Sequence, residues 1–333
     1  MKVVVPFYPL YVPTEKEDYF KICADAGNGA VFNLAGHSFW ETLKTAWSSP
    51  VHAHGRGWPF PEGLPFFGGR MIYSFHNNFI GKKKTAIWVR RFLFNRCLAV
   101  IVQTEFAKNN YVKQGIDPSK IRLIPHAIDF PYFSKPRNGA AFRKRMGLGP
   151  DEPFAFCVGI RWFKNPGVII DGCRKAGIRL VMAGFKNSGD TWKGYEWLMP
   201  SLSLEDAEKK GCILAGHLNA EDLLSAYDSA TVFVNSSEND GENFGIAVYE
   251  AAAAGKALCL PDFGGFDIFK SCARFHPNHD SDKLSNNIRY FVDHPEERKI
   301  YGLKAREIAA KFDYPIILNR LKNFYRELGI LPK

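Results

Sequence analysis

The sequence predicts an α/β protein with two domains, each built around a parallel β-sheet. Three observations lead to this prediction. Short apolar runs alternate along the chain with longer segments of helical period, which is the pattern of strands and helices in a parallel sheet. Most of the runs lack polar alternation, as strands covered on both faces should. The chain is 333 residues long, which is enough for two hydrophobic cores.

The elements follow from the same pattern. The predicted strands are residues 3–6, 71–75, 99–103, 154–159, 180–184, 213–215, 231–235 and 257–260. The predicted helices are residues 105–114, 166–176, 220–228, 246–255 and 314–328. The stretch 134–153 is polar, basic and rich in Gly and Pro, so it is predicted to be a linker. The predicted domains are therefore residues 1–150 and 151–313, followed by a C-terminal helix in 314–333.

Composition narrows the class of protein. Hydrophobic residues make up 46% of the chain and charged residues 23%, which excludes a disordered or repetitive protein. The longest apolar run, residues 97–102, is far shorter than the roughly 20 residues that span a bilayer. The start, MKVVVPFYPL, is predicted to be a strand and not a signal peptide, so we expect a cytoplasmic protein.

Cysteine usage and charge add two expectations. The seven cysteines are odd in number and show no C-x-x-C spacing, and several lie in apolar runs, so buried free thiols are predicted. The net charge of +10 indicates a polyanionic partner. That partner could be nucleic acid, a membrane surface or a phosphorylated small molecule, and composition does not choose among them.

The segment SSENDGENFGIAVYE, residues 236–250, carries the most chemistry. A polar loop follows a predicted strand and leads into a helix near Phe244. Ligands of parallel sheets bind outside the carboxyl ends of strands, and a helix N-terminus favours phosphate. Glu242 and Glu250 lie eight positions apart, or about 80° around a helix, so both could contact one elongated ligand. Taken singly, each carboxylate could equally be a dipole-complementing or solvated charge.

This segment resembles the hallmark of retaining glycosyltransferases of family four. The matching residues are Glu242, Phe244, Gly245, Glu250, Ala251, Gly255, Gly264 and Gly265. The resemblance implies the GT-B architecture, in which two Rossmann-like domains face each other across a cleft and the last helix crosses back to the N-terminal domain. It covers residues 154–328 well and the earlier part less, where an aromatic, proline-rich stretch at 6–13 replaces the family's Gly-Gly loop.

The resemblance also implies a donor site in the C-terminal domain. The segment PFAFCVGIRWFKNPGVII is similar to the family's first strand and basic loop, so Arg161 and Lys164 would clamp a diphosphate, although a pair of surface charges is the competing interpretation. Glu242 would bind hydroxyls of the donor sugar, and Glu250 those of the ribose. The remaining expected donor contacts are Asn243, Phe244, Gly245, Ile246, His217 and Leu218.

The N-terminal half carries a histidine pattern. The runs VHAH and YSFHN resemble two strands of the family, which implies that His76 contacts the transferred sugar or the reacting centre. IPHAID, residues 124–129, is similar to the family's Ile-Pro-Asn-Gly-Val-Asp segment. His52 and His54 have the spacing of metal ligands, but no third ligand is evident in the sequence, so no metal is expected.

Residues 81–96 bear on the acceptor. On a helix, Trp88, Val89, Phe92 and Leu93 would gather on one side, with Lys84, Arg90 and Arg91 on another. Such a helix could rest on an anionic membrane that carries a lipid-linked acceptor. Alternatively, it packs on its own sheet with a solvated basic face.

The resemblance thus implies a retaining, metal-independent glycosyltransferase that needs no cofactor. The donor would be a UDP-, GDP- or ADP-linked sugar, and the acceptor a glycan, a lipid-linked molecule or a small molecule. A nucleotide-sugar epimerase or a phosphorylase of the same fold is the alternative enzyme. A basic nucleic-acid-binding protein or an inactive sugar-binding protein is the alternative of another class, although no nucleic-acid-binding motif is present and no nucleic acid partner is expected. We expect peripheral contact at the inner face of the membrane at most.

Overall fold

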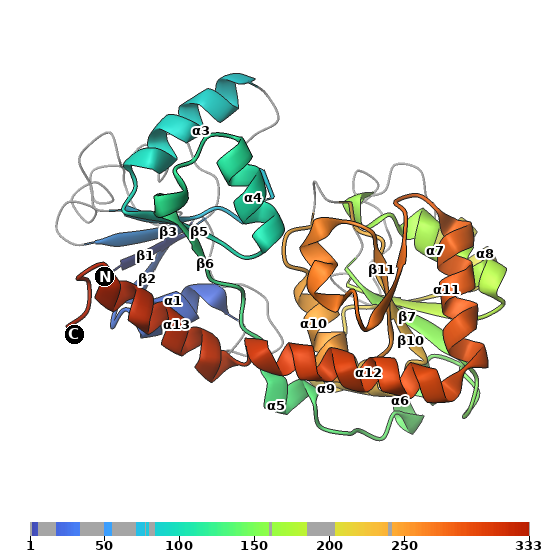
Figure 1. The fold of residues 1–333 in the computed structure, drawn as a ribbon. Coiled ribbons are helices and arrows are strands. Elements are labelled where there is room, and N and C mark those ends of the chain that lie inside the picture. Colours follow the sequence, from blue (N-terminus) through green and yellow to red (C-terminus); the bar gives the residue numbers. More distant parts are fainter. Residues whose placement is uncertain are drawn as a thin grey trace. The chain divides into compact units, whose positions relative to one another are not determined.

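The chain folds into two compact units. The computed structural model describes residues 2–5, 18–33, 50–54, 71–76, 78–79, 84–159, 162–184, 204–238 and 242–332. The first unit comprises Met1–Asp129 and Phe312–Lys333, and the second comprises Phe130–Lys311. Each contains a six-stranded sheet whose described strand pairs are all parallel (Figure 1). The predicted α/β class with two parallel-sheet units is therefore confirmed.

The first sheet has the order β2-β1-β3-β4-β5-β6. Its strands are β1 (Lys2–Val5), β2 (Ala30–Asn33), β3 (Val51–His54), β4 (Met71–Ser74), β5 (Ala99–Val102) and β6 (Ile121–Leu123). Its helices are α1 (Tyr19–Ala26), α3 (Lys84–Arg96), α4 (Glu105–Lys113), the short η4 (Pro118–Lys120) and α13 (Tyr314–Glu327). Helices α3 and α4 cover one face, and α1 and α13 cover the other (Figure 1). Successive residues of β4 show this, because Tyr73 packs toward α3 while Ile72 packs toward α13.

Helix α13 belongs to the first unit although it ends the chain. The Asp313 side chain accepts a hydrogen bond from the Tyr314 N–H at the start of the helix. The Ile128 N–H donates to the Phe312 carbonyl, and the Ile128 carbonyl accepts from Tyr314. The helix then packs on α1 and buries Leu321 and Tyr325.

The second sheet has the order β12-β11-β10-β7-β8-β9. Its strands are β7 (Phe154–Val158), β8 (Arg179–Ala183), β9 (Cys212–Gly216), β10 (Val232–Val234), β11 (Leu258–Pro261) and β12 (Ala273–His276). Its helices are α5 (Phe130–Phe133), α6 (Ala140–Arg145), η5 (Trp162–Lys164), α7 (Pro166–Ala176), α8 (Leu204–Lys209), α9 (Ala220–Ser229), α10 (Ile246–Ala253), η7 (Gly264–Phe269), α11 (Ser281–Asp293), α12 (Pro295–Ala309) and η8 (Ala310–Phe312). Phe156 of β7 meets Tyr227 of α9, while its neighbours in β7 face α7 and α11.

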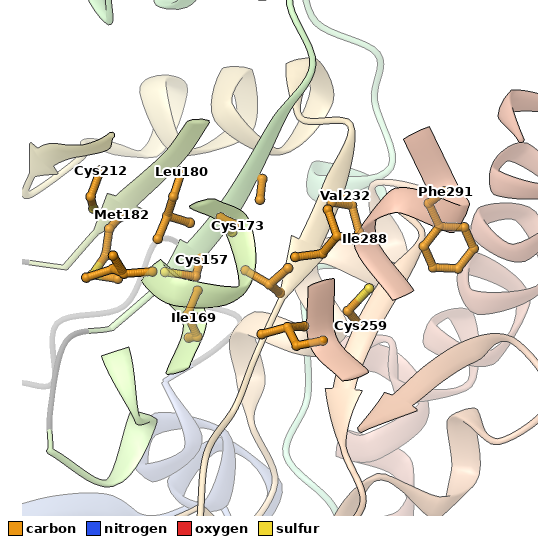
Figure 2. Close-up of a cluster of buried hydrophobic side chains, with 14 of the residues drawn as sticks. Cys157, Ile169, Cys173, Leu180, Met182, Cys212, Val232, Cys259, Ile288 and Phe291 are labelled. Carbon is orange, nitrogen blue, oxygen red and sulfur yellow. The ribbon is translucent and has the colours of Figure 1, made fainter. Parts of the chain in front are cut away.

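One core of the second unit is unusually rich in cysteine. Cys157, Cys173, Cys212 and Cys259 lie among the aliphatic side chains between the sheet and helices α7 and α11 (Figure 2). All seven cysteines are free and buried, which confirms the predicted free thiols. Burial raises the pKa of the Cys212 thiol to about 12, so these groups act as small apolar side chains.

The predicted linker is wrong. Residues 140–145 of the basic stretch form α6, which packs against α9. The Arg143 guanidinium donates hydrogen bonds to the carbonyls of Gly149, Glu152 and Ser229, and Phe142 is buried. The stretch is therefore a folded part of the second unit, and the boundary lies after Asp129 instead of at residue 150.

The predicted apolar side of α3 is also wrong. Leu93 is fully buried and Val89 packs against the core, but Trp88 is 64% exposed and Phe92 is 42% exposed. Arg90 lies toward the sheet, with its guanidinium 5.0 Å from the centre of the Phe75 ring, so a cation–π contact occupies part of the core-facing side. In the described part of the chain, no helix combines the length and apolarity needed to cross a bilayer.

Candidate active site

The strand order of the second sheet reverses at β7, which pairs with β8 on one side and β10 on the other. Parallel sheets bind ligands at such a point, outside the carboxyl ends of the strands. The loops that follow β7 and β10 meet there. The Glu238 N–H donates to the Phe163 carbonyl at 2.7 Å, and the Asn165 amide donates to the Ser236 carbonyl at 2.9 Å. These bonds fix the two loops to each other.

Lys164 and Glu242 come together between these loops. The Lys164 ammonium forms an ion pair with Glu242 Oε2, and the two side chains are only 16% and 13% exposed. The Ser237 hydroxyl donates to the same oxygen at 3.3 Å. The cation expected to hold phosphate and the carboxylate expected to hold the sugar therefore neutralise each other here. An incoming phosphate would compete with Glu242 for Lys164.

Glu250 lies close by, on the buried side of α10. Its carboxyl group accepts a hydrogen bond from the Tyr227 hydroxyl of α9 at 2.5 Å. Burial raises the pKa of Glu250 to about 7, against the opposing effects of the Tyr227 hydrogen bond and the Lys164 charge. Glu250 is therefore a carboxyl group whose charge changes near neutral pH, and the charge of Lys164 acts on it.

Close packing holds the start of α10 in place. Gly245 has φ +74°, and a Cβ there would lie 2.8 Å from the Phe266 ring. The Phe244 ring stacks on Tyr249 with centroids 3.9 Å apart, and Asn243 is buried. Only glycine fits at this position without strain, so the Phe-Gly pair of the motif has a structural reason. Ile246 begins the helix directly after it.

Two other residues expected to contact the donor follow a strand that does not adjoin β7. His217 and Leu218 follow β9, which is separated from β7 by β8. They lie at the same edge of the sheet, with His217 exposed and Leu218 buried. Arg161 lies outside the described residues, as do residues 6–13 and 239–241.

In the first unit, three histidines gather at the carboxyl edge of the sheet. His54 ends β3, His76 follows β4 and His126 follows β6. His54 Nδ1 lies 3.0 Å from His76 Nε2, and the His76 and His126 rings stack with centroids 5.2 Å apart. Burial lowers the pKa of His76 to about 4, and burial lowers those of His54 and His126 well below the usual value. All three are therefore neutral at physiological pH.

Cys23, which was not evident as a metal ligand in the sequence, lies beside the two histidines of β3. The ligating atoms of Cys23, His52 and His54 all lie within 4.8 Å of one another. His52 already uses both ring nitrogens, because Nδ1 meets the Tyr325 hydroxyl at 2.7 Å and Nε2 meets the Ser74 hydroxyl at 2.8 Å. Metal binding through His52 would break one of these bonds. Hydrogen bonding thus accounts for the position of His52, and the expected absence of a metal stays a prediction.

Sequence reasoning missed several residues of these clusters. Ser237 and Asn165 stand in the very loops that carry the motif, so a count of their polar residues would have found them. Tyr227 gave no signal, because it lies on the apolar side of an amphipathic helix like any core residue. His126 was visible as a departure from the family's segment.

Two α/β units, each built on a parallel sheet, place the protein in the GT-B class. The comparisons agree. The model for glycosyl transferases group 1 matches residues 140–308, and the model for Glycosyltransferase Family 4 matches residues 29–130. The chain belongs to the glycosyl transferases group 1 family, which confirms the resemblance.

Similar proteins span several glycosyltransferases. The D-inositol 3-phosphate glycosyltransferase of Kineococcus radiotolerans is 25% identical over 235 residues, which are 64% of this chain and 53% of that protein. The D-rhamnosyltransferase WbpZ of Pseudomonas aeruginosa is 22% identical over 259 residues, which are 74% of this chain and 65% of WbpZ. The chain therefore spans about half to two thirds of the length of these relatives.

Solved structures share the fold. Anabaena Alr3699/HepE in complex with UDP and glucose has a TM-score of 0.78 at 14% identity, covering 98% of this chain and all of that one. Sucrose-phosphate synthase from Thermosynechococcus elongatus has a TM-score of 0.69 at 20% identity, covering 87% of this chain and 76% of that one.

Proposed function

We propose that the protein is a retaining glycosyltransferase that moves a sugar from a nucleotide-diphosphate sugar to an acceptor hydroxyl. The observation that carries the proposal is the Lys164–Glu242 pair beside the buried Glu250, at the reversal point of the second sheet. Membership of a glycosyltransferase family supports it. The UDP and glucose bound to Alr3699/HepE, a protein of the same fold, favour a nucleotide sugar as the ligand.

Each residue has a role in this proposal. The donor diphosphate takes the place of Glu242 as the partner of Lys164, and Arg161 assists. Glu242 is thereby released to accept hydrogen bonds from hydroxyls of the sugar. Glu250 accepts hydrogen bonds from the ribose. Asn243, Phe244, Gly245 and Ile246 shape the phosphate side of the site, while His217 and Leu218 flank the base.

The reaction needs positive charge beside the donor diphosphate, because this leaving group gains negative charge as its bond to the sugar breaks. As the bond between the anomeric carbon and the diphosphate oxygen breaks, Lys164 and Arg161 stabilise the departing phosphate. That phosphate takes the proton of the acceptor hydroxyl, whose oxygen bonds to the anomeric carbon on the same face. His76 contacts the transferred sugar as a neutral imidazole, which does not attract free anions. The proposal includes no metal and no cofactor.

The acceptor is a glycan, a lipid-linked molecule or a small molecule, and α3 supports peripheral contact with an anionic membrane on the cytoplasmic side. The exposed Trp88 and Phe92 lie one helical turn apart. Lys84, Arg91 and Arg96 are exposed on the same side of the helix, and residues 84–96 contain no acidic side chain. Aromatic rings between cations suit the interface of an anionic bilayer.

The test is a panel of UDP-, GDP- and ADP-sugars, screened by thermal shift and then assayed for release of the nucleoside diphosphate. We expect one nucleotide class to stabilise the protein and to be turned over when an acceptor is added. An epimerase would convert the sugar without releasing the nucleotide. Salt-sensitive binding of an oligonucleotide, without binding of any nucleotide sugar, would indicate the nucleic-acid-binding class instead.

A further inference from the structure

We propose that Tyr227 is a positioning residue that holds the carboxyl group of Glu250 in place, and in its ionised form, for the ribose of the donor. The inference rests on the proposed function, in which Glu250 accepts hydrogen bonds from that ribose. Tyr227 lies on a different helix, α9, and is fully buried, whereas Glu250 keeps 4% of its surface exposed. Tyr227 can therefore act on a ligand only through Glu250.

The hydrogen bond between the two side chains has a defined direction when Glu250 is ionised. The Tyr227 hydroxyl lies 2.5 Å from Glu250 Oε2. A carboxylate carries no hydrogen, so the tyrosine hydroxyl must donate. The same hydroxyl lies 3.3 Å from the Ala247 carbonyl, which can accept its hydrogen when Glu250 is neutral. The bond to the charged form is the stronger arrangement, so Tyr227 favours the ionised carboxyl group.

Three aromatic rings fix the position of the Tyr227 hydroxyl. Phe156 of β7 and Phe133 of α5 meet the tyrosine ring edge to face, with centroids 5.2 and 6.0 Å away. Phe233 of β10 adds a tilted contact at 5.9 Å. Because the ring is packed against three elements, it has little freedom to turn. The hydroxyl is therefore placed before any ligand binds, and it in turn places the Glu250 carboxyl group.

Two interactions favour the ionised form of Glu250 against the cost of its burial, namely the hydrogen bond from Tyr227 and the charge of Lys164. The charge of Lys164 is itself compensated by Glu242. Helices α5 and α12 and strand β11 pack against α10 and place no further charge beside Glu250. The titratable groups of α5 and β11 are Tyr132 and Cys259, the buried residues of α12 are Gly302, Ala305 and Ala309, and Asp228 of α9 interacts with Lys256.

The test compares Tyr227→Phe with Tyr111→Phe. Each substitution removes the hydroxyl of a fully buried tyrosine and keeps its ring. The Tyr111 hydroxyl donates to the Phe75 carbonyl in the first unit, so this variant controls for the loss of a buried hydrogen bond. NMR spectra of protein with ¹³C-labelled glutamate report the titration of Glu250, whose signal is assigned with Glu250→Gln. Calorimetry measures the affinity for UDP, GDP and ADP in the wild type and in Glu250→Gln, each with and without Tyr227→Phe.

We expect the midpoint of the Glu250 titration to rise by about one pH unit in Tyr227→Phe and to stay unchanged in Tyr111→Phe. Affinity for the preferred nucleoside diphosphate at pH 7 should then fall about fivefold in Tyr227→Phe, because a smaller fraction of Glu250 is ionised. The same substitution should leave the affinity of Glu250→Gln unchanged, since Tyr227 acts through the carboxylate. A role confined to packing would lower stability without moving the titration.

The proposal is wrong if Glu250 titrates with the same midpoint in the wild type and in Tyr227→Phe. It is also wrong if Tyr227→Phe lowers affinity as much in Glu250→Gln as in the wild type. The NMR titration needs no ligand. A raised midpoint in a protein that binds none of the three diphosphates would support the action of Tyr227 on Glu250 and overturn the proposed function alone.

Discussion

Lys164 forms an ion pair with Glu242 in a setting where neither side chain is more than one fifth exposed. The pair joins the loops that follow two neighbouring strands, β7 and β10. It keeps both charges compensated before a ligand arrives, because a largely buried charge without a partner is costly. In the proposed function, donor binding exchanges these partners, with phosphate replacing the carboxylate.

The variant Glu242→Ala distinguishes an effect on turnover from an effect on nucleotide affinity. The substitution removes the partner of Lys164, so the ammonium becomes fully available to phosphate, while the sugar loses its carboxylate. We expect turnover to fall about a hundredfold or more, with affinity for the free nucleoside diphosphate unchanged or higher. Steady-state kinetics with the preferred donor and fluorescence titration of the diphosphate check this. The opposite order of effects would contradict the role given to Glu242.

The proposed contact of Glu250 with the ribose predicts that nucleotide affinity depends on pH. Its pKa is raised to about 7 by burial, so the carboxyl group ionises as the pH passes through neutrality. An ionised group accepts ribose hydrogen bonds better, and affinity should therefore rise between about pH 6 and pH 8. Glu250→Gln stays neutral and supplies the control, since it retains the titration of the diphosphate itself. Identical pH profiles for the wild type and Glu250→Gln would count against a role for Glu250 in binding.

The neutral histidines make the first unit sensitive to acid. Burial lowers the pKa of His76 to about 4, whereas the unfolded side chain titrates near 6.5. Above that value the group is neutral in both states. As the pH falls below it, the unfolded chain binds protons first and stability is lost, by about 2 kcal/mol for His76 at pH 5.

Urea unfolding at pH 7.5 and pH 5 measures this loss. Glu250 acts in the opposite direction, because its raised pKa favours the folded state as the pH falls toward 5. The informative quantity is therefore the difference between the wild type and His76→Gln, which should lose less stability in acid. An equal loss in both proteins would show that His76 is not buried in the neutral form.

Gly245→Ala should destabilise the protein by about 2–4 kcal/mol, since it adds backbone strain to a clash with Phe266. Gly255→Ala, at the other end of α10, is the matched control. Gly255 has a similar φ of +70°, but a Cβ there would meet nothing within 4 Å, so only the strain of about 1 kcal/mol is expected. Thermal unfolding of both variants compares them. If Gly245→Ala loses no more stability than Gly255→Ala, the predicted clash with Phe266 is contradicted.

Membrane contact through α3 predicts sedimentation with anionic vesicles. The double variant Trp88→Ala and Phe92→Ala should reduce binding to phosphatidylglycerol vesicles about tenfold or more, because each ring loses its interfacial burial. Ile300→Ala with Leu303→Ala is the control, since these side chains of α12 are exposed to about the same degree, at 49% and 51%. An equal effect of both double variants, or equal binding to uncharged vesicles, would contradict binding of anionic membranes through this side of α3.

Sequence patterns located the buried elements well. Each of the eight predicted strands occurs within about two residues of its expected bounds, and the helix expected at 166–176 has those limits. Their apolar runs are decided by burial on both sides, which a sequence displays directly. Strands β2, β6 and β12 were missed, as were α1, α11 and α12. The signal of β12, in which Arg274 and His276 alternate with apolar residues, is that of a partly polar edge strand.

The sequence indicated candidate residues of the site but not the contacts between them. Glu242, Glu250 and Lys164 were named as candidates from the sequence. The pairing of Lys164 with Glu242 depends on how two loops 78 residues apart meet, and no local pattern encodes that. The orientation of α3 was misjudged because Arg90 takes a core-facing position through its contact with Phe75. Because the prediction treated Arg90 as solvent-exposed, it placed the core-facing side of α3 wrongly.

Calorimetric titration of UDP, GDP and ADP into the wild type and Lys164→Ala tests most directly whether the second unit binds a nucleoside diphosphate between β7 and β10. Lys210→Ala, which removes an exposed lysine paired with Asp171, is the control. We predict that one nucleotide class binds the wild type and Lys210→Ala alike, with about tenfold or more weaker binding to Lys164→Ala. Binding of none of the three by the wild type, or equal binding by Lys164→Ala, would contradict the account.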